Sequence, residues 1–223
     1  MAQLTFDLSG EAALGRADFC ITASNEAAAG WIDRWPAWPT PALVLHGPQG
    51  CGKTHLANLW CVRAAACRVA GPRLDESRLR QLLESGDRRI AVDDADRAGE
   101  PALLHLFNAC HEDGGSLLLT ARAPPALWPT MLADLASRLR GAHSVGIAQP
   151  DDALFAAVLV KHFADRQVRV SAEIIAYLGR HLDRSLAEAA AMVAALDAAA
   201  LRDRVAITVP LARRVLAERA AQS

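Results

Sequence analysis

Lysine is nearly absent from this chain of 223 residues. Among its 24 lysine and arginine residues only Lys53 and Lys161 are lysine, and 25 acidic residues leave a net charge of −1. A chain without a surplus of positive charge has no field that attracts nucleic acid, so its composition gives no support for direct DNA binding. A lysine in a chain that otherwise uses arginine indicates a position where a compact point charge is needed.

Long apolar runs and paired cysteines are also lacking. No stretch reaches the roughly 18 apolar residues of a membrane span, and no basic start followed by an apolar core predicts a secretory signal. The cysteines form no CxxC pair and are Cys20, Cys51, Cys61, Cys67 and Cys110. We expect them to be small buried residues in a reducing cytoplasm, with no metal cluster. With 52% hydrophobic and 22% charged residues, the chain is predicted to be a folded cytoplasmic protein of one or two domains.

Residues 47–54 read Gly-Pro-Gln-Gly-Cys-Gly-Lys-Thr and match the phosphate-binding pattern GxxxxGK[ST]. Glycines let the backbone turn so that consecutive N–H groups point at phosphate oxygens. Lys53 is predicted to meet the β- and γ-phosphates, and the Thr54 hydroxyl to bind Mg²⁺. An apolar run precedes this phosphate loop and a helical pattern follows it, as the motif requires. The predicted ligand is ADP or ATP with Mg²⁺, held by Gly47, Pro48, Gln49, Gly50, Cys51, Gly52, Lys53, Thr54 and His55.

Short apolar runs alternate with helical patterns from about residue 23 to residue 150. Strands are predicted at 42–45, 68–70, 90–93, 116–120 and 144–147. Helices are predicted at 25–35, 55–66, 76–84, 100–112 and 132–139. This alternation is typical of an α/β domain with a parallel five-stranded sheet covered on both faces.

Strand patterns stop after Pro150. The remaining segments all read as helices, at 151–166, 172–182, 186–201 and 210–219. Ser171 and Thr208 are predicted caps, and Pro210 lies near the start of the last helix. The chain is therefore predicted to have three parts: a tail (1–22), an α/β nucleotide-binding domain (23–150) and a small all-helical domain (151–223).

Two carboxylates, Asp93 and Asp94, follow the apolar strand predicted at 90–93. Ligands of parallel nucleotide-binding sheets sit at the carboxyl ends of the strands, beside the phosphate loop. Asp93 is therefore the predicted partner of Mg²⁺, directly or through water. Asp94 could polarise an attacking water or hold a neighbouring group.

This ordered set of motifs resembles the AAA+ initiator family of DnaA and its relatives. Residues 50–56 with the Asp-Asp pair carry the resemblance, and it extends from about residue 17 to residue 220. Residues 17–19 and 24–27 are similar to the family's adenine-pocket segment, which implies contacts from Phe19 and Asn25. The resemblance implies the AAA+ fold, with the helical domain as a lid on the nucleotide.

Three further segments are similar to the family's arginine-bearing and sensor elements. Residues 135–139 resemble the element with the arginine finger, which implies that Arg138 acts on nucleotide held by DnaA, with Arg140 and Arg122 as alternatives. Residues 182–186 resemble the second sensor, so Arg184 should reach the phosphates of this chain's own nucleotide. Residues 120–125 resemble the first sensor loop. Arg122 stands there in place of a short polar or acidic residue, which predicts weak or no intrinsic ATP hydrolysis.

Residues 3–8 resemble the clamp-binding peptide of the Hda-type members of this family. That resemblance implies that Gln3, Leu4, Phe6 and Leu8 dock onto the sliding clamp, the β subunit of DNA polymerase III. No DNA-binding helix-turn-helix domain is expected after the lid, so DNA would be met only through the clamp, with no membrane contact. The implied function is regulatory inactivation: with ADP and the clamp, the protein stimulates ATP hydrolysis by DnaA. Self-association is left open.

A self-sufficient ATPase, such as a helicase loader acting on single-stranded DNA, is the main alternative. A loader should bind nucleic acid with strong salt dependence and hydrolyse ATP unaided, and the neutral charge and absence of a basic tail speak against it. A small metabolic kinase is the third possibility. It would need a substrate pocket and lid arginines within the α/β part, whereas the helical part here is C-terminal.

Overall fold

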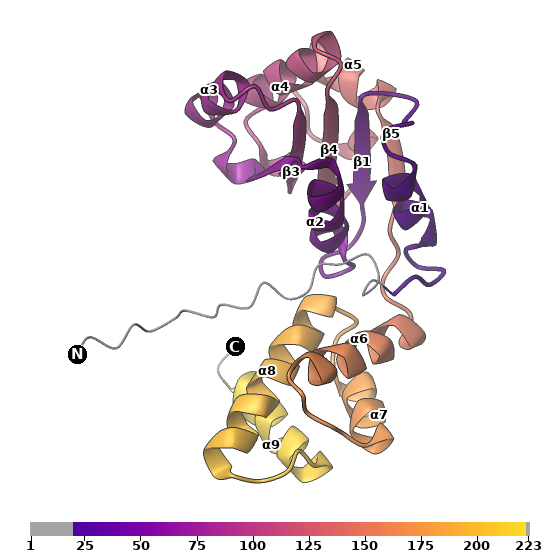
Figure 1. Cartoon of the computed structure of the whole chain (residues 1–223), viewed down its shortest axis with the longest axis vertical. Helices are drawn as coiled ribbons and strands as arrows, with labels where there is room; N and C mark the ends of the chain where they lie inside the picture. Colours follow the sequence, from indigo (N-terminus) through magenta and orange to yellow (C-terminus); the bar gives the residue numbers. More distant parts are fainter. Residues whose placement is uncertain (1–19, 222–223) are drawn as a thin grey trace, which may run out of the picture.

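Five parallel strands form the centre of the α/β domain in the computed structural model, which describes residues 20–221 (Figure 1). They are β1 (Ala42–His46), β2 (Cys67–Ala70), β3 (Arg89–Asp93), β4 (Ser116–Ala121) and β5 (His143–Gly146). Their order in the sheet is β2-β3-β4-β1-β5, and every neighbouring pair is parallel. The predicted AAA+ fold, a parallel five-stranded sheet followed by a helical lid, is confirmed.

Helices cover both faces of the sheet because the strands are apolar on both sides. On one face α3 (Glu76–Glu84), α4 (Glu100–Glu112) and α5 (Ala133–Gly141) pack over strand residues such as Val44 and Leu119. On the other face α1 (Glu26–Arg34) and α2 (Lys53–Ala64) pack over alternate residues such as Leu43 and Leu118. Successive side chains of a strand point to opposite faces, so each strand contributes to both cores.

The lid has a core of its own. It consists of α6 (Asp152–Asp165), α7 (Ala172–His181), α8 (Leu186–Asp203) and α9 (Val209–Ala220). Phe155, Phe163 and Met192 are buried among these helices. In Figure 1 the lid lies below the α/β domain, next to the end of the sheet where α2 begins. None of the helices in the described part of the chain is long and apolar enough to span a membrane.

The predicted helices and strands lie within about two residues of the observed ones. The largest shift concerns α2, which was predicted to begin at His55 and begins at Lys53, so the last residues of the phosphate loop form its first turn. Short 3₁₀ turns η2 (Gly71–Arg73), η3 (Ala95–Arg97) and η4 (Pro125–Leu127) were not predicted. Three residues are too few to show a hydrophobic period.

Candidate nucleotide-binding site

The phosphate loop (residues 47–54) connects β1 to α2 and touches the lid. Gly50 has φ +76° and Gly52 has φ +103°, conformations that residues with a side chain rarely adopt. A Cβ on Gly50 would lie 2.1 Å from the Ser185 hydroxyl oxygen. The Gly50 carbonyl accepts a hydrogen bond of 2.8 Å from the backbone N–H of Leu186. Glycine is therefore required at this position both by the turn and by the closeness of the lid.

Lys53 is buried, with 7% of its surface exposed, and its ammonium lies inside the loop. It donates hydrogen bonds to the carbonyls of Gly47 (2.8 Å) and Pro48 (2.7 Å). Burial, and secondarily this positive charge, lower the pKa of His46. Burial also raises the pKa of the Cys51 thiol, which lies 3.7 Å from the ammonium nitrogen. The loop therefore concentrates its positive charge on one side chain.

A cavity of about 500 Å³ opens between the phosphate loop and the lid. Helix α6 contributes Val158, Lys161 and His162 to its lid side. Burial, followed by the charges of Lys161 and His162, lowers the pKa of His55 on the opposite wall. Asp165 of the same helix also lines the cavity and pairs with Lys161 at 2.9 Å, so this wall combines apolar side chains with an ion pair. The apolar part of the wall is suited to a flat apolar group, and the phosphate loop opposite it to an anion.

Asn25 also lines the cavity, as the resemblance implied, and is only 3% exposed. Its amide donates to the Cys20 carbonyl (3.0 Å) and its side-chain oxygen accepts from the Thr22 N–H (3.0 Å). Asn25 therefore holds the segment that forms this wall. Phe19, its predicted companion, lies outside the described residues, as do Gln3, Leu4, Phe6 and Leu8 of the predicted clamp-binding peptide.

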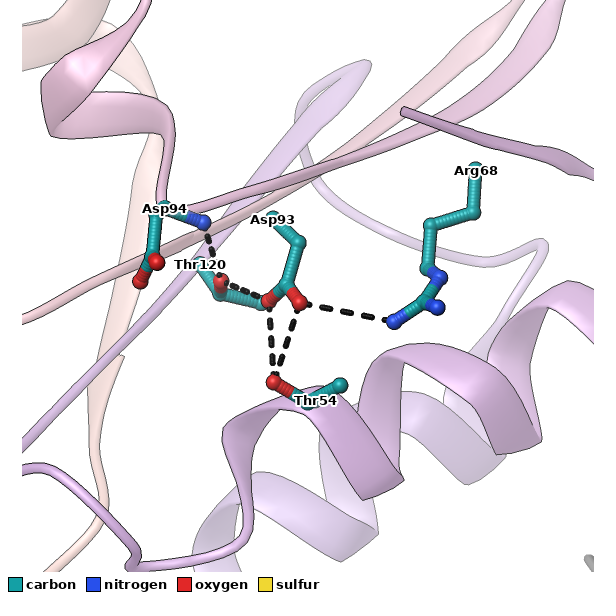
Figure 2. A network of polar contacts seen from close by, with 5 residues as sticks. All are labelled: Thr54, Arg68, Asp93, Asp94 and Thr120. Carbon is teal, nitrogen blue, oxygen red and sulfur yellow. Dashed lines mark hydrogen bonds and ion pairs between the residues drawn. The ribbon is translucent and has the colours of Figure 1, made fainter. Parts of the chain in front are cut away.

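Asp93 is the centre of a polar network at the foot of the phosphate loop (Figure 2). The Thr54 hydroxyl lies 3.1 and 3.0 Å from its two carboxylate oxygens. The Thr120 hydroxyl donates to Asp93 (2.6 Å) and accepts from the Asp94 N–H (3.0 Å). Two hydroxyl groups thus fix the carboxylate, and β4 is tied to the end of β3.

This arrangement fits Mg²⁺. A hydroxyl that donates its hydrogen to a carboxylate keeps lone pairs for a cation, and hard divalent ions prefer oxygen ligands. Thr54 lines the cavity and Asp93 lies behind it, so Thr54 would hold the ion and Asp93 would act through Thr54 or through water. Both residues are the ones predicted from the sequence to bind Mg²⁺.

Two members of the network were missed by the sequence analysis. Thr120 is fully buried at the end of an apolar strand, and a hydroxyl in such a place indicates a specific hydrogen bond. Arg68 lies on β2 and its guanidinium nitrogen is 3.4 Å from Asp93 Oδ2. Arg68 could have been noticed in the sequence because it is a charged residue inside a predicted strand.

Asp94 and Arg122 both line the cavity, from the ends of β3 and β4. Asp94 has φ +54°, a left-handed conformation that costs energy for a residue with a side chain. The Arg122 backbone N–H lies 3.3 Å from a carboxylate oxygen of Asp96, which holds the start of this loop. One acidic and one basic side chain therefore face the space next to the phosphate loop.

The arginines assigned by resemblance lie elsewhere. Arg184 forms an ion pair with Asp152 (2.7 Å), packs over the Phe155 ring and is not a lining residue of the cavity. Arg138 and Arg140 are exposed in the last turn of α5, which Figure 1 shows at the far end of the α/β domain from the lid. Neither lines the cavity, so a phosphate that either one touches would belong to another molecule.

Comparisons with known proteins agree with this architecture. Residues 151–216 match the family model described as "Hda, lid domain". The chromosomal replication initiator DnaA of Thermomicrobium roseum is 24% identical over 200 residues, which cover 79% of this chain and 43% of that protein. The chain is therefore similar to DnaA over most of its length, and to the Hda family in its lid. It spans less than half the length of the curated DnaA relatives that it matches.

Solved structures of DnaA share the fold of this chain. Domain III of DnaA from Thermotoga maritima has a TM-score of 0.78 at 16% identity and covers 91% of this chain and 95% of its own. AMPPCP-bound DnaA from Aquifex aeolicus has a TM-score of 0.66 at 16% identity, covering 80% of this chain and 63% of its own. These structures show the shared fold, and the match at residues 151–216 shows that the lid is similar to the Hda type.

Proposed function

We propose that this protein is a nucleotide-binding regulator that, together with the sliding clamp, stimulates ATP hydrolysis by DnaA. The observation that carries the proposal is a complete phosphate loop joined directly to an Hda-type lid through Gly50 and Leu186. A loop that contacts the lid gives bound nucleotide a way to set the position of the lid. Nucleotide can then act as a structural ligand that stabilises one arrangement of the two domains.

The chain's own residues supply the binding chemistry for ADP or ATP. Helix α2 begins inside the phosphate loop, so its N-terminal amides and its dipole would offer positive potential to phosphates bound there. Lys53, now bonded to two loop carbonyls, would offer its ammonium to phosphate oxygens, and Thr54 with Asp93 would hold Mg²⁺. Mg²⁺ would offset phosphate charge. The apolar part of the cavity beside α6 receives the base.

Weak intrinsic hydrolysis is part of the same proposal. Arg122 lines the cavity at a position where an acidic or short polar residue would orient an attacking water. A guanidinium has donors only and cannot accept a proton from water at neutral pH. Asp94 is the remaining candidate for that task, because Asp93 is held by its two threonine partners and would serve the metal.

Action on DnaA requires a group that reaches nucleotide on the partner. Arg138 is our candidate, because it is exposed on α5, and no hydrogen bond or ion pair of its side chain is found among the described residues. An arginine supplied across an interface neutralises charge that develops on the transferring phosphoryl group, and such residues contribute roughly 10³–10⁵ in rate. Arg140 on the same helical turn is the alternative.

The sliding clamp is the second partner in this proposal. Gln3, Leu4, Phe6 and Leu8 would bind the clamp as an extended peptide, and DNA would be contacted only through the clamp. The protein would then work in the cytoplasm, without a membrane partner, and could also associate with itself.

The test is the rate of ATP hydrolysis by ATP-loaded DnaA with and without this protein, in the presence of ADP and DNA-loaded clamp. Omitting each component in turn gives the controls. We expect acceleration that requires both ADP and the clamp. Hydrolysis by this protein alone, stimulated by single-stranded DNA and without any effect on DnaA, would instead identify a loader-type ATPase.

A further inference from the structure

Asp93 has a third partner besides its two threonines. The Arg68 guanidinium nitrogen lies 3.4 Å from Asp93 Oδ2, on the side away from Thr120 (Figure 2). Arg68 comes from β2, which pairs with β3 in the sheet, and is not a lining residue of the nucleotide cavity. Arg68 therefore contacts Asp93 and not the cavity, so we expect it to act on bound nucleotide chiefly through Asp93.

Arg68 contributes charge near the Asp93 carboxylate but is not needed to orient it. Thr54 and Thr120 already hold both oxygens of Asp93, so the carboxylate keeps its place without the arginine. What Arg68 adds is a positive charge that opposes the negative charge of Asp93. The side chain of Asp93 is 19% exposed and that of Arg68 is 42% exposed, so solvent weakens this effect without removing it.

Arg68 would weaken the electrostatic attraction between Asp93 and a cation bound to the Thr54 hydroxyl. Mg²⁺ is held in nucleotide sites by few protein ligands and by phosphate oxygens, so the charge behind the hydroxyl sets much of its affinity. We propose that the charge of Arg68, acting through Asp93, lowers the Mg²⁺ requirement of nucleotide binding, so that ADP binds nearly as well without Mg²⁺ as with it. The inference rests on the proposed nucleotide-binding function.

The experiment measures the dissociation constant of ADP by calorimetry, once with Mg²⁺ and once with EDTA, and compares their ratio between variants. We expect the unsubstituted protein to bind ADP within about threefold in the two conditions, and R68Q to increase the ratio by about fivefold. R68K, which keeps the charge, should restore the original ratio. R63Q is the matched control, because Arg63 is an exposed arginine whose ion pair is with Asp33.

A double-mutant cycle with D93N tests the route of the effect. If Arg68 acts through Asp93, R68Q should not change the ratio when Asp93 is already asparagine. An unchanged ratio in R68Q, or an equal change in the D93N background, would overturn the inference while leaving nucleotide binding intact. R68M gives the same comparison if R68Q does not fold. No ADP binding by the unsubstituted protein in either condition would overturn the proposed nucleotide site itself.

Discussion

The backbone N–H of Leu186 donates a hydrogen bond of 2.8 Å to the carbonyl of Gly50. Leu186 is the first residue of α8 in the lid, and Gly50 lies in the phosphate loop. The same Gly50 has the Ser185 hydroxyl where its Cβ would be. A movement of the loop on nucleotide binding must therefore displace or reorient the start of α8, which couples the phosphates to the lid.

Gly50→Ala should reduce ADP affinity by about a hundredfold. The new methyl group would occupy the place of the Ser185 hydroxyl, and the left-handed φ of +76° would cost the new residue about 1–2 kcal/mol. Calorimetric titration with ADP measures the change. Gly30→Ala is the control, because nothing lies within 4 Å of a Cβ at that helical position. Gly30→Ala should keep ADP affinity and stabilise the fold by up to about 1 kcal/mol. Equal ADP affinity in Gly50→Ala would contradict the close packing of lid and loop.

Arg184→Ala should weaken ADP binding about tenfold, if the lid arginine turns toward the phosphates as the resemblance implies. Asp152 now holds this guanidinium at 2.7 Å, but the carboxylate is 87% exposed and the pair contributes little to stability. Asp152→Asn should therefore leave ADP affinity equal or higher, since it releases Arg184. Loss of affinity in Asp152→Asn with none in Arg184→Ala would show that the arginine only supports lid packing against Phe155.

Arg138→Ala should retain ADP binding and clamp binding. The factor by which the protein accelerates ATP hydrolysis by DnaA should fall by about a hundredfold or more. The physical reason is the loss of a positive charge at a transferring phosphoryl group on the partner. Arg140→Ala, two residues along the same helix, is the matched control and should retain most of the stimulation. The reverse pattern would assign the finger to Arg140.

Stability should fall as the pH is lowered through about 6.5, and His55 should contribute to the fall. Burial, with Lys161 and His162 nearby, keeps the pKa of His55 below its usual value. The folded protein then binds fewer protons than the unfolded chain below about pH 6.5, so acid favours unfolding, whereas above that pH this residue contributes nothing. Urea unfolding between pH 7.5 and 5.5 measures the slope.

His55→Gln should reduce that slope. His162, whose pKa is also lowered, chiefly by burial, would account for part of the remainder. The comparison variant is His105→Gln, which removes an exposed histidine of α4 outside the nucleotide cavity. If His55→Gln and the unsubstituted protein lose stability in parallel as the pH falls, His55 is not a source of the acid sensitivity.

The phosphate loop, the strands and the helices could all be predicted from the sequence, because each depends on residues that are close together in the chain. Glycines at fixed spacing determine the loop, and the apolar run of residues 42–45 is enough to indicate a buried strand such as β1. Asp93 could be predicted for the same reason, since the residue at the end of β3 must lie at the carboxyl edge of a parallel sheet.

What Asp93 touches was decided only by the tertiary structure. Arg68 and Thr120 are 25 and 27 residues away along the chain, and they meet Asp93 because β3 lies between β2 and β4. The same holds for Ser185 against Gly50 and for Arg184 against Asp152. A single sequence contains the residue types that can form such contacts. Their pairing depends on strand order and on the docking of the lid, which arise from burying apolar surface over the whole chain and leave no local pattern.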